Sequence, residues 1–152
     1  MKAVVQRVSS ASVRVDGESV ARIGAGMLVL LGVARGDGAQ EARKLAERIA
    51  RFRFFADEED RMNRSAVDLG LAALVVSQFT LAADVRAGRR PSFDDAAPAQ
   101  AAEPVVEAFV GAMRSAGLAV ETGRFGARMQ VELVNDGPVT FVLEERAGSE
   151  RS

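Results

Sequence analysis

Residues 3–15 read Ala-Val-Val-Gln-Arg-Val-Ser-Ser-Ala-Ser-Val-Arg-Val, and the rest of the fold can be worked out from this stretch. Valines alternate with polar residues along it, which is the pattern of a strand that buries one face. Asp16 and Gly17 favour a tight turn, so residues 18–23 are expected to return as the second strand of a hairpin. The chain therefore begins as antiparallel sheet.

Later apolar stretches extend this sheet. Residues 27–33 are almost continuously apolar, as are residues 71–76, and such runs are typical of strands covered on both faces. Asn-Asp-Gly at 135–137 is common hairpin chemistry because these residues tolerate the backbone angles of tight turns. Further strands are expected over residues 118–122, 129–134 and 139–144.

Helical periodicity appears in two places. Asp37 with Gln40 resembles a capping box, and it precedes an apolar stripe that ends at Phe52. A second amphipathic helix is expected from roughly Glu103 to Ala116, with a proline in its first turn. The predicted fold class is α+β, with a largely antiparallel, barrel-like sheet and two main helices. One domain is expected over residues 1–146, followed by a flexible tail at 147–152.

The composition excludes several kinds of chemistry. The 152 residues include no cysteine and no histidine, which rules out a Ser-His-Asp or Cys-His mechanism and any histidine-ligated metal. The formal net charge is −1, so nucleic acid could be bound only through a local basic patch. No apolar run approaches the roughly 20 residues of a membrane span, and the first residues lack a signal-peptide pattern. We expect a cytoplasmic protein without membrane contact, metal or cofactor.

Two charged regions have ordinary explanations. The acidic run at residues 57–60 lacks the spaced glycine and partner ligands of a calcium loop, which favours a solvated turn within a charged loop at 56–65. Arginines and glutamates on the first helix, opposite its apolar stripe, are expected to face solvent.

Three stretches carry more polar or rigid residues than a scaffold needs. Ser-Gln-Phe-Thr at 77–80 directly follows a buried strand, where the sheet can fix the position of functional groups. Paired arginines in Gly-Arg-Arg-Pro-Ser-Phe at 88–93 suit phosphate contact beside an aromatic ring. Gly137-Pro138 forms a stiff corner that permits a cis peptide bond. Each also has a plainer interpretation, namely local backbone hydrogen bonding, a solvated loop and a plain turn.

Taken together, these stretches resemble the D-aminoacyl-tRNA deacylase family over about residues 1–145. The active-site motifs of that family correspond to residues 77–80 and to Asn-Asp-Gly-Pro-Val-Thr at 135–140. Arg128 stands where the family usually carries aspartate, which alters a surface or RNA contact and no active-site residue. The other matching motifs are Ala-Val-Val-Gln-Arg-Val at 3–8, Ala-Ser-Val at 11–13, Leu-Leu-Gly-Val at 30–33, Arg-Met-Asn at 61–63, Gly-Arg-Arg-Pro-Ser-Phe at 88–93 and Thr-Gly-Arg-Phe-Gly-Ala at 122–127.

The resemblance implies a homodimeric hydrolase that cleaves the ester joining a D-amino acid, or glycine, to the 3′ end of tRNA. Its expected partners are therefore D-aminoacyl-tRNA, Gly-tRNA and a second copy of the chain. The implied catalytic residues are Ser77, Gln78, Phe79 and Thr80. A cis Gly137-Pro138 from the other subunit would direct its carbonyl oxygens into the site, reaching the substrate's α-amino group and excluding an L side chain.

The resemblance also assigns residues around the site. Arg7 is expected to hold the Gly-Pro corner, although a simple strand-face arginine is the alternative. The aminoacyl pocket is expected to include Ala102, Phe125, Gly126 and Met129. The expected contacts to tRNA phosphates are Arg86, Arg89 and Arg90.

The implied mechanism is substrate-assisted. The terminal ribose 2′-hydroxyl helps to activate the attacking water, and the backbone N–H of Phe79 holds the developing oxyanion. Thr80 is expected to position groups by hydrogen bonding, with a covalent Thr80 nucleophile as the rival. Asp84 or Asp136 as the base is a further alternative. A non-catalytic RNA-end-binding module and a general esterase of small acyl groups are rival functions.

Overall fold

The computed structural model describes residues 1–148, so most of the expected tail at 147–152 lies outside the described residues. The elements, in chain order, are β1 (Lys2–Val15), β2 (Glu18–Ile23), β3 (Gly26–Gly32), α1 (Ala39–Arg51), β4 (Phe55–Ala56), β5 (Met62–Arg64), α2 (Ala66–Leu69), β6 (Ala72–Ser77), the 3₁₀ turn η1 (Phe79–Ala82), α3 (Ala99–Ser115), β7 (Ala119–Thr122) and β8 (Gln130–Glu144).

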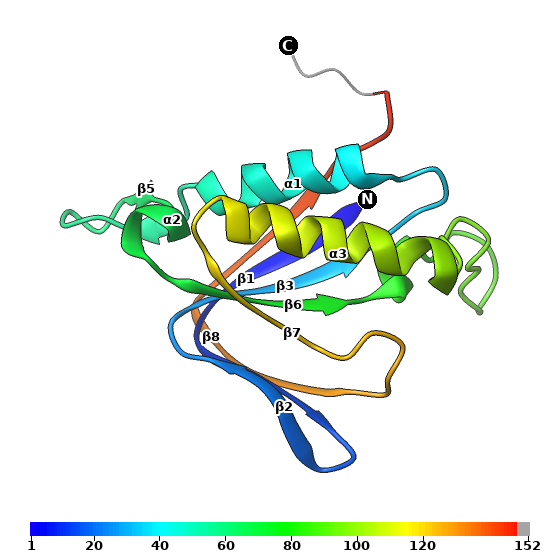
Figure 1. Ribbon diagram of the computed structural model, residues 1–152, viewed down its shortest axis with the longest axis horizontal. Helices are drawn as coiled ribbons and strands as arrows, with labels where there is room; N and C mark the ends of the chain where they lie inside the picture. Colours follow the sequence, from blue (N-terminus) through cyan, green and yellow to red (C-terminus); the bar gives the residue numbers. More distant parts are fainter. Residues whose placement is uncertain (149–152) are drawn as a thin grey trace.

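The long strand β1 organises the main sheet. It pairs antiparallel with β2, β3 and β8, while β6 joins β3 and β7 joins β6 in parallel. The sheet curls so that β2 and the first, orange part of β8 lie below β3 and β6 in Figure 1, whereas the C-terminal end of β8 lies beside the start of β1. The prediction of a largely antiparallel, barrel-like α+β fold with two main helices is confirmed, and the two parallel pairs are an addition to it.

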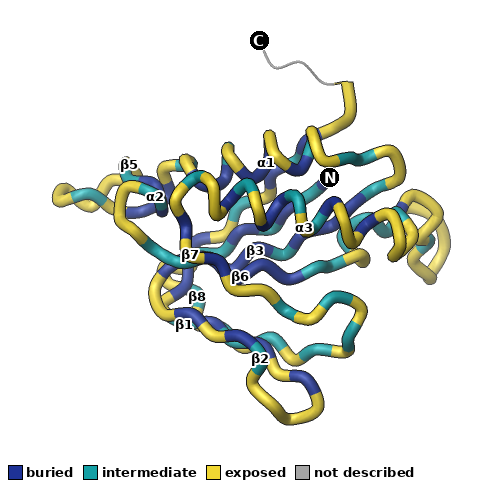
Figure 2. Tube along the Cα trace, in the orientation of Figure 1, coloured by how far each residue is buried: buried dark blue, intermediate teal, exposed yellow. Residues whose placement is uncertain are grey.

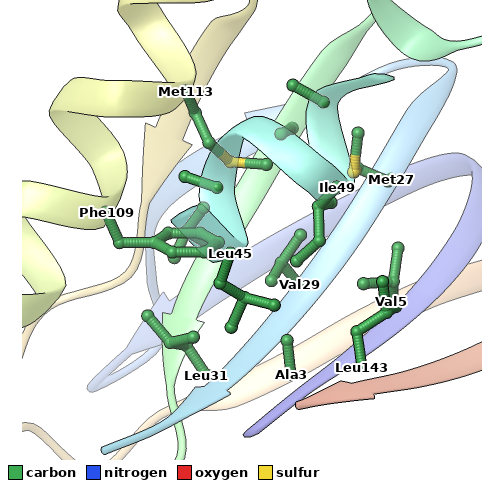
Figure 3. Packing of buried hydrophobic residues seen from close by; sticks show 14 of the residues in the cluster. Ala3, Val5, Met27, Val29, Leu31, Leu45, Ile49, Phe109, Met113 and Leu143 are labelled. Atoms are coloured by element: carbon green, nitrogen blue, oxygen red, sulfur yellow. The ribbon is translucent and has the colours of Figure 1, made fainter. Parts of the chain in front are cut away.

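Helices α1 and α3 cover one face of the sheet (Figure 1). Their apolar stripes meet Ala3, Val5, Met27, Val29 and Leu31 from the strands, as Figure 3 shows. Leu45 and Ile49 of α1 and Phe109 and Met113 of α3 are fully buried there. This main core fixes the ends of the central strands, from which the site described below is built.

The opposite face of the central strands is buried as well. Leu28 of β3 and Leu74 and Val76 of β6 pack against residues of β1 and β2, including Val13 and Ile23. All positions of β3 except Leu30 are therefore buried, as are the four central positions of β6 (Figure 2). This confirms that the two continuously apolar stretches are strands covered on both faces.

The expected hairpin at 135–137 is wrong. Residues 130–144 form one strand, β8, which pairs with β1 along almost its whole length. Between the pairs Gln6↔Thr140 and Val8↔Asn135, β1 advances by two residues while β8 uses five, so the Asn-Asp-Gly-Pro segment bulges out of a continuous ladder. Pairing with a distant strand overrides the local turn signal.

Both helix starts also differ from expectation. Gly38 is the N-cap of α1, and its N–H donates to Glu41 Oε2 at 2.8 Å. Asp37 instead accepts from the N–H of Ala34 and pairs with the Met1 amino group. Helix α3 begins at Ala99, so Pro104 lies in its second turn, because the alanine-rich residues before it are strong helix formers.

The charged segment at 56–65 is more ordered than a loop. Phe55 pairs with Arg64 and Ala56 with Met62 in a two-stranded ladder. The Asp57 carboxylate closes the turn by accepting the N–H groups of Glu59 and Arg61. Within residues 1–148, no group of three or more acidic side chains is arranged to hold a metal ion. No helix of that part is long and apolar enough to cross a membrane.

Candidate active site

A pocket of about 480 Å³ opens at the carboxyl ends of β3 and β6. The expected catalytic residues Ser77, Gln78 and Phe79 line it. The four residues expected in the aminoacyl pocket, Ala102, Phe125, Gly126 and Met129, line it too. The remaining wall consists of Val33, Val76, Ala97, Ala99, Ala127 and Val131, so the pocket is mostly apolar with polar groups at one side.

The polar side is made by the chain leaving β6. Ser77 still pairs with Leu31 of β3, and the N–H of Gln78 donates to the Leu31 carbonyl at 2.7 Å. The 3₁₀ turn η1 then begins at Phe79, and its first hydrogen bond uses the N–H of Leu81. Among the hydrogen bonds of residues 1–148, none uses the N–H of Phe79 or Thr80. The start of η1 therefore carries two unpaired backbone donors, and one of them, the N–H of Phe79, belongs to a residue that lines the pocket.

Thr80 lies outside the pocket lining. Its hydroxyl accepts a hydrogen bond from the Gln78 side-chain Nε2, and the residue is exposed. No hydrogen bond within residues 1–148 joins this hydroxyl to a carboxylate or an amine. An alcohol needs an adjacent base to become a good nucleophile, so this geometry favours a positioning role.

Asp84 is engaged by Arg86. The Arg86 guanidinium donates to both carboxylate oxygens, at 2.9 and 2.8 Å, and its backbone N–H adds a third bond. The side-chain hydrogen bond from Arg86 holds the pKa of Asp84 far below its usual range, and the same pair raises the pKa of Arg86. A carboxylate with so low a pKa is a weak base, and the Arg86 guanidinium is already engaged by that carboxylate.

The loop at residues 86–93, called the arginine loop here, borders the 3₁₀ turn η1. Phe93 of the loop packs against Phe79, with ring centroids 5.2 Å apart. Both rings are exposed, at 39% and 59%, so they form an aromatic lip beside the pocket. Arg89 and Arg90 are exposed, and no ion pair within residues 1–148 includes them. These two arginines remain available for an anionic partner.

The bulge of β8 carries the second motif. The Gly137–Pro138 peptide bond is cis, and both residues are exposed. Asn135 braces the bulge from inside, since its Oδ1 accepts the Val139 N–H at 2.9 Å and its Nδ2 donates to the Thr140 hydroxyl at 3.0 Å.

Arg7 holds the bulge from β1. Its Nε donates to the Asp136 carbonyl at 2.9 Å, and its Nη1 donates to the Phe54 carbonyl at 3.0 Å. Gly137 has a φ of +137°, and a Cβ added there would lie 2.6 Å from Val139 Cγ2. The site therefore admits only glycine without rearrangement.

The bulge does not line the pocket of its own chain. Val131 is the last pocket residue on β8, and the strand advances about 13 Å from there to Asn135, at roughly 3.3 Å per residue. Asp136, Gly137 and Pro138 follow beyond that point. The two motifs thus lie at separate places on the same chain.

Two glycines have a structural role that the sequence pattern alone does not show. A Cβ on Gly32 would lie 2.8 Å from Leu81 Cβ and 3.1 Å from the Gln78 carbonyl oxygen, so Gly32 lets η1 lie against β3. A Cβ on Gly123 would lie 2.7 Å from Met129 Sδ, a pocket atom. Only the packing of distant segments reveals these roles, although Gly32 and Gly123 fall within matched motifs.

Three comparisons with known proteins agree. The family profile described as "D-Tyr-tRNA(Tyr) deacylase" matches residues 4–144. A protein named D-aminoacyl-tRNA deacylase from Roseiflexus sp. (strain RS-1) is 62% identical over 144 residues, covering 95% of this chain and 93% of its own. The protein of that name from Anaeromyxobacter dehalogenans (strain 2CP-C) is 59% identical over 146 residues, covering 96% and 98%.

Solved structures show the same fold. A structure titled "c-Myc DNA Unwinding Element Binding Protein" superposes with a TM-score of 0.91 at 42% identity, covering 97% of this chain and 100% of that one. A structure titled as a probable eukaryotic D-amino acid tRNA deacylase has a TM-score of 0.77 at 18% identity, covering 93% and 97%, which shows likeness of fold alone.

Proposed function

The chain belongs to the D-Tyr-tRNA(Tyr) deacylase family, and on that premise we propose that it hydrolyses the ester of D-aminoacyl-tRNA and of Gly-tRNA. The family match confirms the resemblance seen in the sequence and makes the enzyme a hydrolase of ester bonds. The observation that carries the proposal is the apolar pocket beside the unpaired N–H of Phe79, in a chain without histidine or cysteine.

The chemistry follows from those donors. Water adds to the ester carbonyl, the N–H of Phe79 donates to the oxyanion, and the bond to the ribose 3′ oxygen then breaks as that oxygen takes a proton. The substrate's own 2′-hydroxyl relays the proton from the water, because none of the described residues that line the pocket carries a basic side chain. Ser77 and Gln78 shape the polar wall, and Thr80 fixes the Gln78 amide through their hydrogen bond.

Chiral selection needs the other motif. Gly137 and Pro138 lie too far along β8 to reach the pocket of their own chain, which supports a homodimer in which each corner enters the partner's site. Backbone carbonyl oxygens placed against the substrate's α-carbon would exclude an L side chain and bind the α-amino group. Glycine has no side chain, so Gly-tRNA would pass the same filter.

Contacts to the RNA fall on the arginine loop. Arg89 and Arg90 are the better candidates for phosphate contact, because Arg86 already pairs with Asp84. The exposed rings of Phe79 and Phe93 offer a stacking surface for the terminal base. Because the proposed substrate is used in translation, we expect the enzyme in the cytoplasm.

Deacylation assays on D-Tyr-tRNA, L-Tyr-tRNA and Gly-tRNA test the proposal. We expect release of D-tyrosine and glycine, with the L ester left intact. Protection of the D ester against spontaneous hydrolysis would identify a binding module without catalysis. Equal cleavage of small acyl esters that lack RNA would identify a general esterase. Cleavage of the L ester at the same rate would overturn the role of the corner.

A further inference from the structure

A second shallow groove, of about 650 Å³, lies on the outer face of α1 and is strongly basic. It is lined by Lys44, Glu47, Arg48, Arg51, Phe52 and Arg53, so four cations accompany one carboxylate. Arg48 is partly engaged, since it donates to the Glu144 carbonyl and lies 3.8 Å from Glu145. None of the ion pairs within residues 1–148 includes the other three cations.

The groove differs from an ordinary solvated helix face. Lys44, Arg48 and Arg51 stand on one side of α1 and together span about 10 Å along its axis, at 1.5 Å per residue. Phe52 is half-buried in the same groove and packs edge-on against Phe141. A row of cations beside a fixed aromatic ring suits a chain of phosphates with bases attached.

The position of the groove indicates which part of a substrate would reach it. Ala99 and Ala102, at the start of α3, line the active-site pocket. Helices α1 and α3 lie side by side and run in the same direction in Figure 1, so the C-terminal turn of α1 lies near the far end of α3. The 17 residues of α3 span about 26 Å. Within one chain, only a substrate much longer than a terminal aminoacyl-nucleotide covers that distance. The groove also lies toward the bulge, because Arg7 binds the carbonyls of both Asp136 and Phe54, so in the proposed dimer it borders the partner's pocket.

We propose that this groove binds the phosphate backbone of the tRNA arm whose 3′ end occupies the active-site pocket. The proposal rests on the proposed function for the choice of substrate. The pocket of about 480 Å³ holds only the end of a tRNA, and the chain as a whole carries a net charge of −1. Attraction of the remaining polyanion therefore depends on a local excess of positive charge, which the groove supplies.

The test compares two double variants of equal charge change. Lys44→Glu/Arg51→Glu alters the groove, and Arg14→Glu/Arg22→Glu alters exposed arginines on the β1–β2 hairpin as the control. Each is assayed on D-Tyr-tRNA and on 3′-O-(D-tyrosyl)adenosine over a range of salt concentrations. We expect the groove variant to raise KM for the tRNA about tenfold. Its salt slope should fall by about 2, because each phosphate bound by a cation contributes a slope of about one.

With the adenosine ester, which has none of the phosphates that the groove is proposed to bind, the groove variant should match the wild type. Equal effects of both double variants on the tRNA would overturn the proposal, because a general reduction of positive charge would explain them. An unchanged KM for the tRNA in the groove variant would overturn it as well.

Binding of uncharged tRNA separates this inference from the proposed function. In a filter-binding assay, the groove variant should bind about tenfold more weakly than the control variant, whether or not the wild type cleaves D-Tyr-tRNA. Weaker binding to phosphatidylserine vesicles, with tRNA binding unchanged, would reassign the groove to a membrane surface and overturn the proposal. If the wild type does not cleave D-Tyr-tRNA but the groove variant binds tRNA more weakly as expected, only the proposed hydrolase activity is refuted.

Discussion

The turn at the end of β6 and the bulge of β8 are both built from backbone, yet they differ in what surrounds them. The turn lies against β3 and borders an apolar pocket, whereas the bulge is exposed and is held by hydrogen bonds from the side chains of Arg7 and Asn135. The turn can act within its own chain. The bulge does not line the active-site pocket of its own chain, and this difference is the reason for proposing that it acts in the pocket of a second copy.

The largest expected effect concerns the general base, which the turn at the end of β6 does not supply. Replacing the terminal 2′-hydroxyl of D-aminoacyl-tRNA by hydrogen should slow single-turnover cleavage by about 10²–10⁴-fold, the usual contribution of general acid–base catalysis, with binding little changed. Asp84→Asn and Asp136→Asn enzymes should remain active on the normal substrate. Rapid cleavage of the 2′-deoxy ester, together with an inactive Asn variant, would assign the base to that aspartate.

The oxyanion role of the turn can be tested by removing the backbone N–H of Phe79. Phe79→Pro deletes the N–H expected to hold the oxyanion, and proline suits the first position of η1. We expect kcat to fall about 10²–10³-fold, as for the removal of an oxyanion-hole donor. Phe79→Ala keeps the N–H and removes only the ring, so it should retain most of kcat. Similar kcat values for the two variants would argue against the oxyanion role.

The bulge should respond to a single added methyl group. In Gly137→Ala the new Cβ would meet Val139 Cγ2 at 2.6 Å and the Val139 nitrogen at 2.9 Å, at a φ of +137°. Strain of this kind costs about 1–3 kcal/mol, so we expect cleavage of D-Tyr-tRNA to fall by up to about 100-fold. Gly17→Ala is the control, since its φ is +81° with no atom within 4 Å of the new Cβ. Equal decreases in the two variants would mean that the corner has no special role.

A smaller effect is expected where the turn meets β3. In Gly32→Ala the added Cβ would press on Leu81 and on the Gln78 carbonyl and displace η1 by a few tenths of an ångström. We expect kcat to fall about tenfold with KM little changed, because misplaced catalytic groups cost rate more than binding. Gly24→Ala, with open space at its Cβ, serves as the control. A raised KM with normal kcat would show that Gly32 serves the pocket rather than the turn.

Much of this site could be predicted from the sequence, because its motifs are contiguous. Ser77, Gln78, Phe79, Phe125 and Gly126 fall within matched motifs and are brought together in space, whereas Ala97 and Ala99 line the pocket from outside every matched motif. The path of β8 could not be predicted, since Asn-Asp-Gly is a strong local turn signal and only pairing with β1 shows that the strand continues. The role of Gly32 escapes prediction for a related reason, because a close contact between β3 and η1 leaves no periodic signal.

The central claim is that the bulge of one chain enters the active-site pocket of the other. Subunit mixing tests this claim most directly. Phe79→Pro chains keep a normal corner, and Gly137→Ala chains keep a normal turn. In a mixed dimer the Gly137→Ala pocket would receive the intact corner of its partner, which gives one working site. Random exchange makes half of the dimers mixed, with one of two sites intact, so we predict recovery to about a quarter of wild-type activity. Activity that stays at the mean of the two parents, after subunit exchange is demonstrated, would contradict a site shared between chains.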